Sequence, residues 1–103
     1  MEQFLMTIYD AVNYLKSCCK DSKGYIPTSF GSYYCGVTND IKRREGEHKT
    51  SFLGYVTAKT VKGALDLEAL MHQEGFCTGK QLGNAGDDSV YVYVYKKGSG
   101  TVE

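Results

Sequence analysis

The sequence predicts an α/β fold of the α+β kind, in which helices flank a small, mainly antiparallel sheet. Apolar residues recur at helical spacing over residues 2–19 and 61–74. Extended segments rich in tyrosine and valine lie between and after these stretches, and residues 89–95 alternate strictly as SVYVYVY. Because 103 residues is the size of one domain, residues 1–103 are expected to form a single unit.

Composition and charge restrict the classes of partner. Lysine plus arginine and aspartate plus glutamate both number 12, so the overall charge gives no reason to expect nucleic acid. Any such binding would have to use a local patch, and the obvious one is Lys42, Arg43, Arg44 and Lys49. The 4 cysteines form no C-x-x-C pair and are predicted to be reduced thiols. With no signal peptide and no long apolar run, we expect a soluble, intracellular protein of the cytoplasm without a membrane partner.

The first part of the chain predicts a helix followed by a hairpin. Ile8, Val12 and Leu15 carry the helical spacing of residues 2–19, and residues 21–24 are polar or glycine and end the helix. Tyr25 begins an extended segment ahead of Pro27. We expect residues 25–26 to pair with a strand at residues 33–37 through a short loop that contains proline and glycine.

A strand, a turn and a charged helix follow one another over residues 33–48. The turn consists of residues 38–40, Thr-Asn-Asp, which are N-cap residue types. Helical spacing places Arg44 and His48 on one side and turns Arg43 and Glu47 away as an (i, i+4) pair. A permanent cation beside an imidazole, just after a strand that carries Tyr34, is typical of a phosphate-handling surface. A solvated helix with scattered charge is the alternative.

A third strand is expected at residues 52–57, and the helix over residues 61–74 places Glu68 in the middle of its apolar face. A carboxylate in that position must be paired or hold a metal, because burying it alone is costly. A structural salt bridge to Arg44 is one alternative. Gly75 suits the end of this helix, and residues 76–88 are predicted to form a loop.

Residues 89–95 are the clearest predicted strand. Its valines face one side and its tyrosines the other, so that the tyrosine face consists of Tyr91, Tyr93 and Tyr95. A tyrosine face can stack on bases, but it is more often the half-buried face of a sheet. Residues 98–103 are expected to be a flexible tail.

Tyr34-Cys35-Gly36, with Arg44 eight residues after the glycine and His48 four residues later, resembles the second half of the GIY-YIG nuclease motif. Cys35 departs mildly from the pattern, because the middle residue of this triplet is usually apolar and branched. The first half should be a Gly-Ile-Tyr strand about ten residues earlier. The candidates for its tyrosine are Tyr25, in the scrambled order Gly-Tyr-Ile, and Tyr9, in a better triplet that lies within a helical pattern.

The resemblance covers about residues 24–84 and makes the first helix and the last strand additions to a nuclease core. It implies metal-dependent hydrolysis of a DNA phosphodiester. Tyr25, or else Tyr9, would help to activate water, and Tyr34 would position the water or the phosphate. Arg44 would stabilise charge on the phosphate, and His48 would transfer a proton or grip the phosphate.

The resemblance also implies a cofactor and substrate contacts. Glu68 would hold a divalent metal, expected to be Mg²⁺. Asn84 would contribute a late asparagine near the active site, and the basic Lys42 and Arg43 would contact DNA. A catalytically inactive nuclease-like module that binds nucleic acid or a protein is the alternative function.

Overall fold

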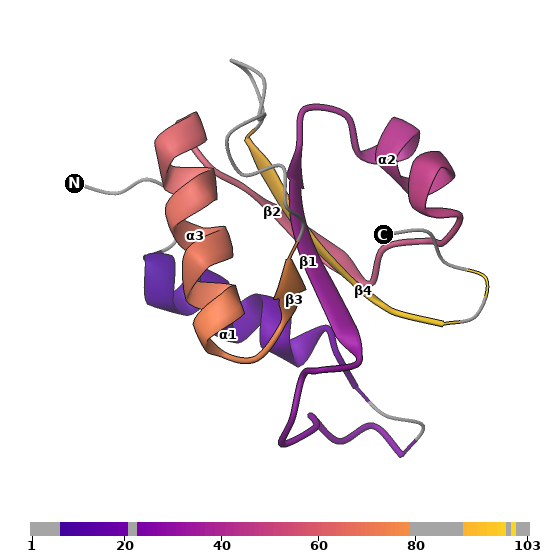
Figure 1. Ribbon diagram of the computed structural model, residues 1–103. Helices are drawn as coiled ribbons and strands as arrows, with labels where there is room; N and C mark the ends of the chain where they lie inside the picture. The colour runs from indigo at the N-terminus through magenta and orange to yellow at the C-terminus, as the bar shows by residue number, and fades with distance from the viewer. Residues whose placement is uncertain (1–6, 21–22, 79–89, 99, 101–103) are drawn as a thin grey trace.

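The computed structural model describes residues 7–20, 23–78, 90–98 and 100. Over these residues the chain is an α+β fold with three helices and a mixed four-stranded sheet (Figure 1). In chain order the elements are α1 (Ile8–Ser17), β1 (Tyr33–Thr38), α2 (Ile41–His48), β2 (Gly54–Thr57), α3 (Val61–Gln73), β3 (Cys77–Thr78) and β4 (Tyr91–Lys96). The predicted fold class is confirmed.

The last strand of the chain lies inside the sheet. The strand order is β2-β4-β1-β3, with β4 antiparallel to both of its neighbours and β3 parallel to β1. The register places Tyr93 opposite Gly36 and Tyr95 opposite Tyr34. The resemblance makes this strand an addition to a core of residues 24–84, whereas β4 joins β1 to β2 and is part of that core.

Helices cover both faces of the sheet. α1 and α3 pack on one face, and α2 lies on the other side of β1 and β4 (Figure 1). Alternation along the strands turns Cys35, Val92 and Val94 toward α1 and α3. The main core forms there, with helix residues that include Ala11, Leu15, Ala64, Leu67 and Met71. This packing explains the apolar faces of both helices.

The opposite face of the sheet carries a second, aromatic cluster. Tyr34, Tyr93 and Tyr95 form it, and Ile41, Phe52 and Cys77 pack against it. The same alternation that turns valine toward α3 turns tyrosine toward α2. The tyrosine face predicted from residues 89–95 is therefore buried at Tyr93 and Tyr95.

Capping residues set the start of each helix. Side chains of Thr7, Asp40 and Thr60 accept hydrogen bonds from backbone N–H groups three residues later, at 3.0–3.1 Å. Lys49 is the C-terminal capping residue of α2 and has a left-handed φ of 59°. Because Asp40 begins α2 directly after β1, it fixes which way the side chains of this short helix point.

Several boundaries differ from those expected. Residues 25–26 form no strand, and the expected hairpin with residues 33–37 is wrong. Two residues ahead of a proline, which lacks an N–H donor, compete poorly with β4, whose register with β1 runs from Tyr33 to Thr38. The expected helix over residues 61–74 is confirmed as Val61–Gln73, and the third strand is shorter than expected.

The structure also bears on the remaining expectations. All four cysteines are free thiols, as predicted. Among the described residues, none of the helices has the length and apolar character needed to cross a membrane. The beginning of the first predicted helix, most of the predicted loop and most of the predicted tail lie outside the described residues.

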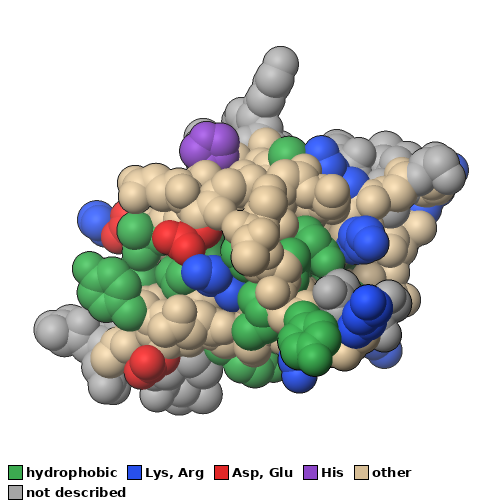
Figure 2. All heavy atoms as spheres, turned by 90° about the horizontal axis from the view of Figure 1, so that it is seen from below, with side chains coloured by type: hydrophobic (Ala, Val, Ile, Leu, Met, Phe, Trp, Pro, Cys, Tyr) green, Lys and Arg blue, Asp and Glu red, His purple; other side chains and the backbone are tan. Residues whose placement is uncertain are grey.

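Basic side chains are unevenly distributed on one face of the molecule even though the two kinds of charge balance in number. On the face in Figure 2, lysine and arginine gather mainly toward the right, while acidic side chains lie toward the left. Hydrophobic side chains lie among the basic ones in this view. The molecule thus has a locally basic surface without a net positive charge.

Candidate functional site

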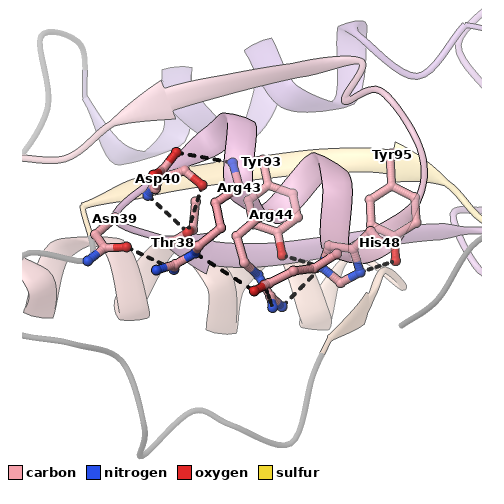
Figure 3. A network of polar contacts seen from close by, with 9 residues as sticks. Thr38, Asn39, Asp40, Arg43, Arg44, His48, Tyr93 and Tyr95 are labelled. Atoms are coloured by element: carbon pink, nitrogen blue, oxygen red, sulfur yellow. Dashed lines mark hydrogen bonds and ion pairs between the residues drawn. The ribbon is translucent and has the colours of Figure 1, made fainter.

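Arg44 and His48 lie one turn apart on α2 and point the same way, as their spacing predicts. The Arg44 Nη2 and His48 Nε2 atoms are 3.0 Å apart. Both side chains lean onto the aromatic cluster, where Tyr93 and Tyr95 reach toward the imidazole from β4 (Figure 3). The site is therefore built by one helix and the central strands of the sheet.

His48 is bonded through both ring nitrogens and is only 2% exposed. Nε2 lies 2.7 Å from the Tyr93 hydroxyl, and Nδ1 lies 3.0 Å from the Tyr95 hydroxyl. A guanidinium can only donate, so Nε2 is an acceptor, and Arg44 and the Tyr93 hydroxyl share its single lone pair. The geometry thus fits a neutral ring that carries its hydrogen on Nδ1 and donates it to Tyr95.

Gly36 makes room for the hydroxyl of Tyr93. A Cβ atom on residue 36 would lie 2.4 Å from Tyr93 Oη and 2.5 Å from Cζ. Glycine is therefore the residue that lets the phenol lie across β1 and reach His48 Nε2. Close packing of Tyr93, from the last strand, therefore explains why residue 36 of the Tyr-Cys-Gly triplet is glycine.

Tyr93 is a neutral hydrogen-bonding group. Burial raises the pKa of Tyr93 well above its ordinary value, and this outweighs the opposing charge and hydrogen bond of Arg44. The phenol therefore keeps its proton at neutral pH. Its hydroxyl can accept from Arg44 and donate to His48 at the same time.

Arg44 connects the buried cluster to the surface. Its side chain is 22% exposed, whereas Tyr34, His48, Tyr93 and Tyr95 are buried. Burial acts to lower the pKa of Arg44, but hydrogen bonds with Glu47 and Tyr93 more than compensate and the pKa is raised. Arg44 Nη1 is 2.5 Å from Glu47 Oε1, so an anion that approached Arg44 would compete with an exposed carboxylate.

Tyr34 joins the site as expected, through its ring. The centroid of the Tyr34 ring lies 5.2 Å from that of the His48 ring and 5.1 Å from that of Tyr95, nearly parallel to the latter at 28°. The ring of Phe52 stacks on the ring of Tyr93, and their centroids are 4.0 Å apart. These rings surround the imidazole and hold it in place.

Glu68 lies on the other side of the sheet from Arg44. It is 3% exposed on the face of α3 that packs against the sheet, and burial raises its pKa to about 7. Its charge contributes, after burial, to the raised pKa of Cys35, which faces α3. The ion pair recorded for Arg44 among the described residues is with Glu47, so the alternative of a structural salt bridge between Glu68 and Arg44 is wrong.

The tyrosines expected from the first half of the motif do not join the cluster. Tyr25 is 70% exposed in the segment ahead of β1, and Tyr9 is 72% exposed on α1. Neither is among the residues that surround His48. Tyr93 and Tyr95 are site residues that the sequence motif does not indicate, although the alternation of residues 89–95 places them on one face.

The two described residues that are expected to bind substrate, Arg43 and Lys42, have different surroundings. Arg43 donates to Asn39 Oδ1 at 3.0 Å and turns away from His48 (Figure 3). Lys42 lines a pocket of about 240 Å³ at the start of α2, together with Asn39, Asp40, Ile41, Tyr55 and Tyr91. Asn84 lies outside the described residues.

The implied Mg²⁺ has one candidate protein ligand. Within the described parts of the chain, no group of three or more His, Cys, Asp or Glu side chains could hold a metal. Mg²⁺ commonly binds through one or two carboxylates together with phosphate oxygens and water. The one buried carboxylate of the described residues, Glu68, is 3% exposed and is separated from Arg44 by the sheet, so a cation held there does not fit a phosphate bound at Arg44.

Comparison of the chain with protein-family models, curated proteins and solved structures found no match. Function is therefore inferred from the residues and their geometry.

Proposed function

We propose that the protein is a metal-dependent DNA endonuclease that hydrolyses phosphodiester bonds. The supporting observation is the exposed edge of the Arg44 guanidinium, fixed to the buried His48 directly after the strand that carries Tyr34. A guanidinium that keeps its charge can bind two phosphate oxygens at once. The order of these residues also resembles the second half of the GIY-YIG motif.

In this proposal Arg44 binds the phosphate and stabilises the charge that gathers on it during attack by water. His48 and Tyr93 hold the guanidinium in one orientation, so that little reorganisation is needed. Tyr34 packs against the imidazole and keeps it in place. Tyr93 cannot serve as a phenolate base in the free protein, because its pKa is raised.

The resemblance assigns the divalent cation to Glu68, although the sheet lies between this carboxylate and Arg44. A divalent cation would supply Lewis-acid stabilisation of the charge on the phosphate. The raised pKa of Glu68, about 7, means that the carboxyl is partly protonated at neutral pH. Loss of that proton would accompany binding of the cation.

A non-cutting nucleic-acid-binding or protein-interaction module is the second candidate. It is favoured by the burial of Tyr34, His48 and Tyr93 and by the position of Glu68 across the sheet from Arg44. In such a module the aromatic cluster would be a structural support for α2. Arg44 would then contribute only to binding.

Cleavage assays separate the candidates. Supercoiled plasmid, linear duplex and branched DNA are incubated with Mg²⁺, Mn²⁺ or EDTA, using the wild type, Arg44→Ala and Glu68→Ala. Arg43→Ala is the matched control, because it removes a neighbouring charge that points away from His48. We expect metal-dependent cleavage that Arg44→Ala lowers by about 100- to 1000-fold, while Arg43→Ala stays within a few-fold of the wild type.

The other outcomes identify the alternatives. Binding that weakens steeply with salt, without cleavage of any substrate, would support the non-cutting nucleic-acid module. Neither binding nor cleavage would support the protein-interaction module. Cleavage with unchanged metal dependence in Glu68→Ala would contradict the role of that carboxylate.

A further inference from the structure

We infer that Tyr93, from the C-terminal strand, is a positioning residue of the site, which holds His48 and Arg44 in place. The strand that pairs with β1 is not a preceding local hairpin strand but β4, far along the chain. This inference rests on the proposed function. Three independent observations support it.

The first observation is the register of the sheet. β4 runs antiparallel to β1 along its whole length, from Tyr33 opposite Lys96 to Thr38 opposite Tyr91. An antiparallel pair places side chains in the same way whether a short loop or a long connection joins the strands. β4 therefore presents Tyr93 to the face of β1 on which Tyr34 lies, as a preceding hairpin strand would have done.

The second observation is the fit between Tyr93 and Gly36. A Cβ on residue 36 would come within 2.4 Å of the Tyr93 hydroxyl oxygen, which is far inside contact distance. Gly36 is the glycine of the Tyr34-Cys35-Gly36 triplet, which resembles part of the GIY-YIG motif. Because Gly36 has no side chain, the Tyr93 hydroxyl can occupy the space where a Cβ of residue 36 would lie.

The third observation is the hydrogen bonding. The Tyr93 hydroxyl is 2.7 Å from His48 Nε2, the same atom that lies 3.0 Å from Arg44 Nη2. The Tyr93 hydroxyl also contributes to the raised pKa of Arg44. Tyr93 therefore restrains the imidazole and the guanidinium together, and it acts on a phosphate through Arg44 because its own side chain is buried.

Tyr95 offers a matched control within the same strand. It is equally buried, faces the same side of the sheet and bonds the same imidazole. Its contact, however, is with Nδ1 on the opposite edge of the ring, and its register partner is Tyr34. Loss of either hydroxyl removes one bond to His48, but only loss of the Tyr93 hydroxyl removes the bond beside Arg44.

The test compares Tyr93→Phe with Tyr95→Phe in single-turnover cleavage of plasmid with Mg²⁺. Partners that orient a functional side chain typically contribute about 10- to 100-fold to activity. We expect Tyr93→Phe to lower the maximal rate by that factor, with DNA affinity within a few-fold of the wild type. Tyr95→Phe is expected to lower the maximal rate by less than Tyr93→Phe does, because its bond is on the edge of the imidazole away from Arg44. Equal rate losses in the two variants, or none, would overturn the inference.

A readout without cleavage keeps the inference separate from the proposed function. NMR measures the rotation of the Arg44 guanidinium in the folded wild type and in both variants. We expect a larger increase in rotation rate in Tyr93→Phe than in Tyr95→Phe. If the wild type cuts no DNA, the proposed function fails and this comparison alone decides whether Tyr93 holds Arg44.

The wild type supplies a further measurement if Tyr93→Phe does not fold. A hydroxyl proton shared between Tyr93 and His48 in a buried site exchanges slowly with water, and we expect an NMR resonance with a contact to the His48 ring. A Tyr93 hydroxyl that exchanges as fast as that of the exposed Tyr25 would overturn the inference.

Discussion

At the residue scale, surroundings give two glutamates opposite behaviour. Glu47 is exposed, and its hydrogen bond with Arg44 is the main reason why its pKa is lowered. Glu68 is buried on the face of α3 that packs against the sheet, and burial raises its pKa to about 7. One carboxylate neutralises a candidate phosphate-binding arginine, while the other is a candidate ligand for a cation.

Glu68 makes stability depend on pH. Its folded pKa of about 7 exceeds its ordinary value of 4.5, so its stabilising contribution is complete below pH 4.5 and is lost as pH rises through 7. We expect the free energy of unfolding to fall by on the order of 3 kcal/mol over this window because of Glu68. Urea unfolding at several pH values measures it.

Glu68→Gln is expected to remove most of that pH dependence and to be more stable than the wild type at pH 8. Asp66→Asn is the control, because this exposed α3 carboxylate pairs with Lys62. If the free energy of unfolding of Glu68→Gln fell with pH between pH 5 and 8 as steeply as that of the wild type, Glu68 would not be the source of the pH dependence.

Glu47 is expected to compete with anions for Arg44. Glu47→Gln removes the carboxylate that lies 2.5 Å from the guanidinium. We expect binding of DNA at low salt to tighten by about 3- to 10-fold and this gain to shrink as salt screens the charge. Fluorescence anisotropy with a labelled duplex measures the affinity. An equal gain in Asp66→Asn would show a general charge effect instead.

Sequence patterns predicted some residue positions well. Helical periodicity placed Arg44 and His48 together and placed Glu68 on a buried face, because both depend on one helix alone. The contact of Tyr93 with His48 depends on which strand pairs with β1. The separation of Glu68 from Arg44 depends on which face of the sheet each helix covers. Local periodicity predicts neither the contact of Tyr93 with His48 nor the separation of Glu68 from Arg44.

At the element scale, the strand-turn-helix unit from β1 to α2 positions the site. Asp40 caps α2 directly after β1, and Gly36 lets Tyr93 cross the strand. The bounds of α2 and α3 were predictable because their capping residues are local. The strand expected at residues 25–26 was wrong because a better partner for β1 lies far along the chain.

Gly36→Ala tests the close approach within this unit. The added Cβ would collide with the phenol of a buried ring, and we expect a loss of about 1–3 kcal/mol in the free energy of unfolding. Gly46→Ala is the control, because nothing lies within 4 Å of a Cβ there, on an exposed face of α2. It is expected to stabilise the protein by up to about 1 kcal/mol. Similar stability of both variants would contradict the packing of Tyr93 over Gly36.

At the scale of the whole molecule, the two ends of the described chain depend on each other. β4 lies between β1 and β2, and its valines complete the core under α1 and α3. The alternation of helical and extended patterns predicted the fold class. It could not predict that the last strand is central, because strand order depends on pairing between distant segments.

A chain of residues 1–89 tests this dependence. Without β4, the strands β1 and β2 lose their shared partner, and the core loses Val92 and Val94. We expect this chain to show no cooperative melting by circular dichroism and no dispersed NMR spectrum. A chain of residues 1–97, which retains β4, is the control and is expected to melt as the full chain does. Cooperative melting of residues 1–89 would contradict the central place of β4.

The most direct test of the proposed activity is nicking of supercoiled plasmid by the full chain in Mg²⁺, with Arg44→Ala alongside at the same concentration of folded protein. We expect the wild type to convert supercoiled plasmid to open circle, EDTA to abolish the conversion, and Arg44→Ala to be slower by about 100-fold or more. Equal rates in the two proteins, or no nicking by a folded wild type, would contradict the proposal that Arg44 and its aromatic support form a nuclease site.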